Sequence, residues 1–154
     1  MLTRYSRQTR PRRGAATVEF AVVLPVLLTF ILGIIEFGRL VMVAQVSTNA
    51  ARETARYASQ GSANTMTVEA HTRNYLTAAG IKGAAAGPGS AVTITIEYQS
   101  GETWTTTTDP SVLPSGTPIR ATVSSNFNQQ SWLPTRFFVG DNLPVQGVVI
   151  MRKE

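Results

Sequence analysis

The stretch Gly14–Arg39, GAATVEFAVVLPVLLTFILGIIEFGR, decides how this chain is organised. Its central part, Phe20–Ile35, is sixteen residues long and carries no charge. At 1.5 Å per residue, a helix from Ala15 to Glu36 is about 30 Å long, which matches the hydrocarbon core of a bilayer. We therefore expect a membrane-spanning helix over residues 15–38.

The positive charge of the chain is concentrated in front of this helix. Fourteen Lys and Arg residues stand against nine Asp and Glu residues. Five of the arginines lie in the leader, residues 1–14, which contains no acid: Arg4, Arg7, Arg10, Arg12 and Arg13. The rest of the chain is neutral, which does not suit a nucleic-acid-binding domain. By the positive-inside rule, we expect the leader in the cytoplasm and the C-terminal part outside.

Two other export signals share parts of this pattern. Arg12-Arg13 is compatible with a twin-arginine signal, but the residues that follow, GAAT, lack its hydrophobic partner. A cleaved secretory signal peptide also combines charge, an apolar run and small residues. However, the apolar run here is long, and the candidate exit site, Met42-Val43-Ala44, is poor and lies inside a continuing helical pattern.

Residues 39–60 continue the helix as an amphipathic, extracytoplasmic segment. One stripe is small or apolar: Leu40, Ala44, Ser47, Ala51, Ala55 and Ala58. The opposite face is polar: Gln45, Asn49, Arg52, Arg56 and Gln60. The small stripe predicts close packing on the chain's own sheet, with a helix of another subunit as the alternative. Arg52 and Arg56 lie one turn apart, where Glu53 offsets part of their repulsion, on either a solvated face or a partner contact.

Residues 61–154 are expected to form an extracytoplasmic α+β domain. A helix is expected over residues 67–79, ended by Gly80. Apolar alternation or apolar runs predict strands over residues 92–98, 103–108, 119–124 and 145–151. Loops or irregular segments are expected at residues 83–90, 109–118 and 132–139. The last strand is nearly all apolar, so we expect it in the centre of the sheet or covered by the helix.

The fold class predicted from these patterns is α+β. One long N-terminal helix, transmembrane at first and then amphipathic, packs on a small, mainly antiparallel sheet.

The sequence offers little for catalysis. There is no cysteine, and His71 is the only histidine. The common nucleophile, phosphate-loop and zinc-protease motifs do not occur. We expect His71 to be a surface residue rather than a metal ligand or a catalytic base. We therefore expect no enzyme activity, no metal, no cofactor, no small-molecule substrate and no nucleic acid.

The residues around Gly14 resemble a prepilin-peptidase signal, in which a basic leader ends in Gly and Glu-Phe stands at the fifth and sixth positions after it. The segments GAATVEFAVVLP (14–25), IEFGR (35–39) and AARETARYA (50–58) are similar to TadE-like pseudopilins of the tight-adherence (Flp) pilus system. The resemblance covers residues 12–59. It implies a pilin-like fold, cleavage between Gly14 and Ala15, and assembly roles for Glu19 and Phe20.

Glu19 has two interpretations. An acid near the N-terminus of a helix is favoured by the helix dipole and stays hydrated near the membrane surface. Alternatively, cleavage would create an α-ammonium on Ala15, four residues away on the same helical face. Glu19 would then neutralise that amine, in its own chain or in a neighbour's, where apolar surroundings strengthen the pairing. The resemblance implies the second interpretation.

The resemblance implies a pseudopilin or minor pilin in the assembly of a Tad-type (Flp) pilus, inserted in the bacterial inner membrane. The partners it implies are prepilin peptidase, the pilus platform proteins, the motor ATPase, the Flp major pilin and related pseudopilins. Candidate partner contacts are Glu36, Arg39, Arg52 and Arg56. The long outer domain favours a minor component. The alternative is an uncleaved, single-pass signal-anchor protein whose envelope domain binds a ligand or partner.

Overall fold

The computed structural model describes residues 13–62, 64–85, 90–132 and 142–154. The leader up to Arg12, the centre of the expected loop 83–90 and most of the segment 132–139 lie outside the described residues. The chain divides into two compact units, Met1–Ile35 and Glu36–Glu154.

Helix α1 runs from Arg13 to Ser59, as the sequence predicts. Pro25 lies inside it, and the Thr29 hydroxyl donates a 2.8 Å hydrogen bond to the Pro25 carbonyl. From Gly14 to Ile35 every side chain is exposed except the half-buried Leu24. Within the described part of the chain, α1 is the one helix that is long and apolar enough to cross a membrane.

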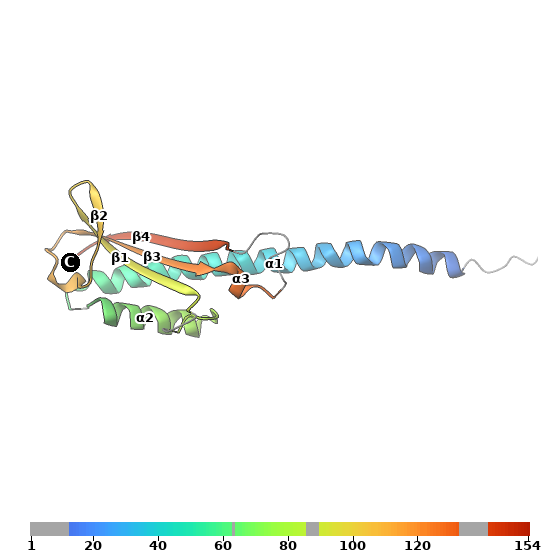
Figure 1. Ribbon diagram of the computed structural model, residues 1–154, viewed down its shortest axis with the longest axis horizontal. Helices are drawn as coiled ribbons and strands as arrows, with labels where there is room; N and C mark the ends of the chain where they lie inside the picture. Colours follow the sequence, from blue (N-terminus) through green and yellow to red (C-terminus); the bar gives the residue numbers. More distant parts are fainter. Residues whose placement is uncertain (1–12, 63, 86–89, 133–141) are drawn as a thin grey trace, which may run out of the picture. The chain divides into compact units, whose positions relative to one another are not determined.

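The second unit is an α+β domain (Figure 1). After α1, its elements are α2 (Thr65–Ala78), β1 (Val92–Ser100), β2 (Thr103–Thr106), the 3₁₀ helix η1 (Pro110–Val112), β3 (Pro118–Asn126), α3 (Phe127–Gln130) and β4 (Pro144–Arg152). The strands form one antiparallel sheet in the order β2-β1-β3-β4. The predicted α+β class, a long helix packed on a small antiparallel sheet, is confirmed.

Both helices pack on the same face of the sheet. The inner face of the sheet is formed by every second residue of β1 and β3, which are the positions predicted to be apolar. On this face Ile94 of β1 pairs with Val123 of β3. One core cluster joins this face to α1 and to Leu76 of α2. Four residues of the predicted stripe are buried, Ser47, Ala51, Ala55 and Ala58, whereas Leu40 and Ala44 are half-buried. The other buried positions of α1 lie beside this stripe: Val43, Ala50, Thr54 and Ser59. The small stripe therefore packs on the chain's own domain.

Local signals define both ends of α2. The side chain of Asn64 caps its N-terminus by accepting a 2.9 Å hydrogen bond from the Thr67 N–H, so α2 begins at Thr65, two residues before the predicted start. At the other end, Gly80 adopts a positive φ of 78°, which allows the Ile81 N–H to bond the Leu76 carbonyl.

Strand β4 meets one of the two alternatives expected for it, cover by the helix, and not the other. It lies at the edge of the sheet, beside β3, rather than in the centre. The side chains of Val148 and Ile150 point to the outer face and are 51% and 55% exposed, so the apolar run does not reflect burial on both faces. The inner face is covered by α1, as the other half of the expectation states. A Cβ added at Gly147 would lie 2.6 Å from Thr48 Cα, so Gly147 permits this close approach.

Candidate functional site

The expected cleavage junction lies in the first turn of α1. Gly14 and Ala15 are both exposed. A Cβ added at Gly14 would meet no other atom within 4 Å, apart from its chain neighbours and the local helix backbone. The junction is therefore accessible, and a side chain at position 14 has no steric cost within the chain itself.

The expected assembly residues lie one turn further along the same helix. Glu19 is exposed and takes part in none of the salt bridges found among the described residues. Phe20 is 61% exposed. Both side chains belong to the long apolar surface of Gly14–Ile35, which the described chain leaves uncovered. Such a surface requires lipid or other protein chains to cover it.

Glu36 and Arg39 stand at the beginning of the second unit and do not form a salt bridge with each other in the described structure. The Glu36 Oε1 atom is shielded from solvent and has no hydrogen-bond partner among the described residues. The Arg39 Nε donates to the main-chain carbonyl of Gln130, and its guanidinium lies 4.8 Å from the ring centroid of Trp132. Arg39 is thus held inside its own domain, whereas Glu36 keeps an unpaired oxygen.

Gln130 is the residue that fixes this corner of the domain. Its side chain is fully buried, its Nε2 donates to the Lys82 carbonyl at 2.8 Å, and its Oε1 accepts from the Lys82 N–H at 2.9 Å. The amide thereby bonds the end of α3 to the turn after α2. Sequence analysis did not identify Gln130 or Trp132, because these contacts join residues far apart in the chain.

Arg56 and Arg52 lie in different surroundings. Arg56 forms a salt bridge of 2.6 Å with Glu53, as expected for residues three apart, and a second hydrogen bond of 3.0 Å with the other carboxylate oxygen. The Arg56 hydrogen bonds, and then that from His71, lower the pKa of Glu53 from 4.5 to about 2. Arg52 is exposed and no salt bridge of the described residues includes it.

His71 is half-buried and connects the two helices. Its Nε2 lies 2.9 Å from Glu53 Oε1, and its ring stacks on Tyr57 at 4.6 Å between centroids. The described residues contain no group of three or more His, Cys, Asp or Glu side chains that could hold a metal ion.

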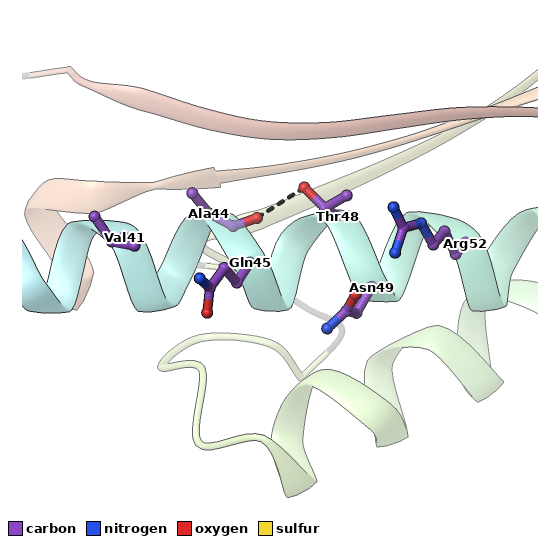
Figure 2. A pocket seen from close by; sticks show the side chains of 6 residues that line it. All are labelled: Val41, Ala44, Gln45, Thr48, Asn49 and Arg52. Carbon is purple, nitrogen blue, oxygen red and sulfur yellow. Dashed lines mark hydrogen bonds between the residues drawn. The ribbon is translucent and has the colours of Figure 1, made fainter.

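An open groove of about 480 Å³ follows one flank of α1 (Figure 2). All of its lining residues belong to α1 and recur at intervals of three or four along one flank: Val41, Ala44, Gln45, Thr48, Asn49 and Arg52. The lining offers an amide, hydroxyl and guanidinium surface with no carboxylate or imidazole.

A second cluster missed by sequence analysis lies on the outer face of the sheet. Arg120 bonds Glu97 at 2.7 Å across β3 and β1, and its guanidinium lies 4.4 Å from the Trp104 ring centroid. The register pairs Glu97 directly with Arg120, so this cluster becomes visible once the strand pairing is known.

Comparison with known families bears on the α1 residues. Residues 14–56 match the family model described as TadE-like protein. All eight site residues proposed from sequence lie within this segment. Comparisons with curated proteins and with solved structures gave no significant match. Residues 14–56 of this chain are therefore similar to the TadE-like family, which confirms the resemblance predicted for this segment.

Proposed function

We propose that this protein is a pseudopilin, or minor pilin, that takes part in assembling a Tad-type (Flp) pilus. The observation that supports this most is the uncovered apolar surface of Gly14–Ile35 at the start of a TadE-like segment, followed by a compact α+β domain. A helix of this kind serves two environments, since lipid and neighbouring pilin helices both cover apolar side chains.

In this proposal the helix crosses the bacterial inner membrane once, with the arginine-rich leader in the cytoplasm and the domain outside. Prepilin peptidase then cleaves after Gly14 and removes all five leader arginines. The exposure of Gly14 and Ala15 supports this step, because a peptidase needs access to the scissile bond.

Assembly follows through α1. Glu19 neutralises the new α-ammonium of Ala15, in the same chain or in a neighbour, and Phe20 packs against neighbouring helices. Among the candidate contacts with platform proteins or other pilins, Glu36 and Arg52 have side-chain charges that no described residue pairs. Arg39 is hydrogen-bonded to Gln130 and Arg56 forms a salt bridge with Glu53. These two arginines would therefore contact a partner while also keeping their bonds within the domain.

N-terminal sequencing of the protein extracted from membranes tests the proposal. A mature chain that begins at Ala15 supports processing by prepilin peptidase. A chain that begins at Met1 overturns it and favours the uncleaved signal-anchor alternative. Co-purification with Flp pilin or platform proteins then distinguishes a pilus component from a processed protein with another role.

A further inference from the structure

Trp132 is presented to solvent at a fixed place in the second unit. Its side chain is 69% exposed, whereas the other tryptophan, Trp104, is half-buried against Arg120. An exposed indole contributes little to the stability of a domain, since most of its apolar area stays in water. Its exposure therefore calls for an explanation outside the domain itself.

The segment that carries Trp132 is firmly anchored. Phe127, at the start of α3, is 2% exposed, and the fully buried Gln130 bonds Lys82 twice through its side-chain amide. The Arg39 Nε donates to the Gln130 carbonyl. Trp132 follows only two residues later, so its position is set by a packed and hydrogen-bonded support.

Arg39 completes the arrangement. Its guanidinium lies 4.8 Å from the Trp132 ring centroid. Among the described residues, no hydrogen-bond acceptor is found for its two Nη groups. A guanidinium binds phosphate oxygens through paired N–H groups, and it does so while stacked on an aromatic ring. The pair thus combines a phosphate-binding cation with an amphipathic ring.

The position of Arg39 along α1 identifies the surface that this pair meets. Arg39 follows Ile35, the last residue of the uncovered apolar segment, by four residues, or about 6 Å of helix. The headgroup layer on each side of a bilayer is about 5–8 Å thick. Tryptophan is enriched at this level because its ring is apolar and its N–H is polar.

We propose that Trp132 and Arg39 bind the phospholipid headgroups of the membrane that α1 crosses, with Arg39 on a lipid phosphate and Trp132 at the headgroup boundary. This inference rests on the proposed membrane insertion. It adds a second lipid contact, made by the folded domain, which limits the domain's freedom to tilt while the protein waits in the bilayer.

Two single-tryptophan variants of the full chain test this contact. Trp104→Phe leaves Trp132 as the reporter, and Trp132→Phe leaves Trp104 as a matched control that also lies beside an arginine. Both variants are reconstituted into vesicles of phosphatidylcholine and phosphatidylglycerol that carry a quencher either near the headgroup or deep in the acyl chain. We expect headgroup-level quencher to reduce Trp132 emission more than deep quencher does, and neither to reduce Trp104 emission.

Arg39→Gln in the Trp104→Phe background tests the phosphate contact. It should lower the quenching of Trp132, whereas Arg152→Gln, on the exposed end of β4, should leave it unchanged. Flotation separates the two proposals. A protein that does not float with vesicles overturns both the insertion and the contact. A protein that floats while Trp132 remains unquenched by lipid overturns the headgroup contact alone.

Discussion

The Glu53 carboxylate on α1 lies 2.9 Å from His71 Nε2 on α2, and the same carboxylate oxygen accepts a 2.6 Å contact from Arg56. One acid thus holds a cation of its own helix and the imidazole of the next helix. The ring of Tyr57, also on α1, stacks on the His71 ring. These contacts join α1 to α2.

Replacing Glu53 should change how stability depends on pH. Because the folded-state pKa of Glu53 is lowered from 4.5 to about 2, its contribution is present above pH 4.5 and is lost as the pH falls toward 2. We expect Glu53→Gln to lower the unfolding free energy by about 1 kcal/mol at neutral pH, since the pair is partly solvated. Thermal unfolding of the detergent-solubilised chain from pH 7 to pH 2 measures this.

The control for Glu53 is Glu102→Gln in the exposed turn between β1 and β2. It should leave the pH dependence as in the wild type. If Glu53→Gln loses stability toward acid as steeply as the wild type does, the Arg56 and His71 contacts do not stabilise the domain.

Gly147 should tolerate no side chain. A Cβ there would overlap the backbone of Ser47 and Thr48, which is helical and cannot move aside without disturbing the core. We expect Gly147→Ala to destabilise the domain by about 2–3 kcal/mol, in the range of overpacked cores. Gly61→Ala is the control, because the nearest atom to its new Cβ is the Lys153 Nζ at 3.9 Å, an ordinary van der Waals distance. Equal melting temperatures for the two variants would contradict the close approach of β4 to α1.

Local patterns predicted most of this fold. The three-and-four spacing of small residues from Leu40 to Ala58 located the buried face of α1, and the alternation in β1 and β3 located the inner face of the sheet. Strand order was not predictable in the same way. The run at β4 is largely apolar on both faces, yet β4 lies at the edge of the sheet and its outer face is exposed, because both helices pack on the other face.

The candidate site was predictable where it is carried by consecutive residues. The salt bridge between Arg56 and Glu53 follows from spacing along one helix. The roles of residues 14–20 in cleavage and assembly come from the family resemblance and stay a prediction. The contacts of Arg39 did not follow, because Gln130 and Trp132 lie about ninety residues further along the chain. No local pattern distinguishes such a contact from an exposed arginine.

Arg52 and Arg56 should separate partner binding from domain stability. Arg52→Glu changes an exposed side chain that lines the groove, so it should reduce co-purification of the pilus partner. The unfolding free energy should change by no more than the about 0–1 kcal/mol of an exposed ion pair, so the melting temperature should stay close to that of the wild type. Arg56→Glu places a second carboxylate beside Glu53 and should lower the melting temperature as well. Arg152→Glu serves as the control on the sheet. Unchanged co-purification for Arg52→Glu would indicate a solvated face.

Gly14 should be required for cleavage and for nothing else. A side chain there would crowd the scissile peptide in the peptidase cleft, so Gly14→Val should accumulate a membrane-inserted precursor that keeps its arginines. Gly33→Val is a matched control, since a Cβ at either glycine meets no other atom within 4 Å. Electrophoretic mobility and N-terminal sequencing measure the outcome. Cleavage of Gly14→Val at Ala15 would remove the pseudopilin proposal.

Glu19 should act after cleavage. Glu19→Val makes the helix more apolar, so membrane insertion should persist, and processing should persist if the peptidase recognises chiefly the Gly14 junction. Incorporation into the pilus should fail, because the Ala15 ammonium would meet no carboxylate in an apolar bundle.

Three variants at this position separate charge from shape. Glu19→Asp keeps the charge on a side chain one methylene shorter and should retain part of the assembly, whereas Glu19→Gln keeps the shape without the charge and should retain none. The fraction of mature protein recovered with sheared pili measures this, relative to the mature protein in membranes. If the Glu19→Val variant were incorporated at the wild-type level, Glu19 would have no special role in assembly. The helix dipole would then be sufficient to explain an acid at this position near the N-terminus and the membrane surface.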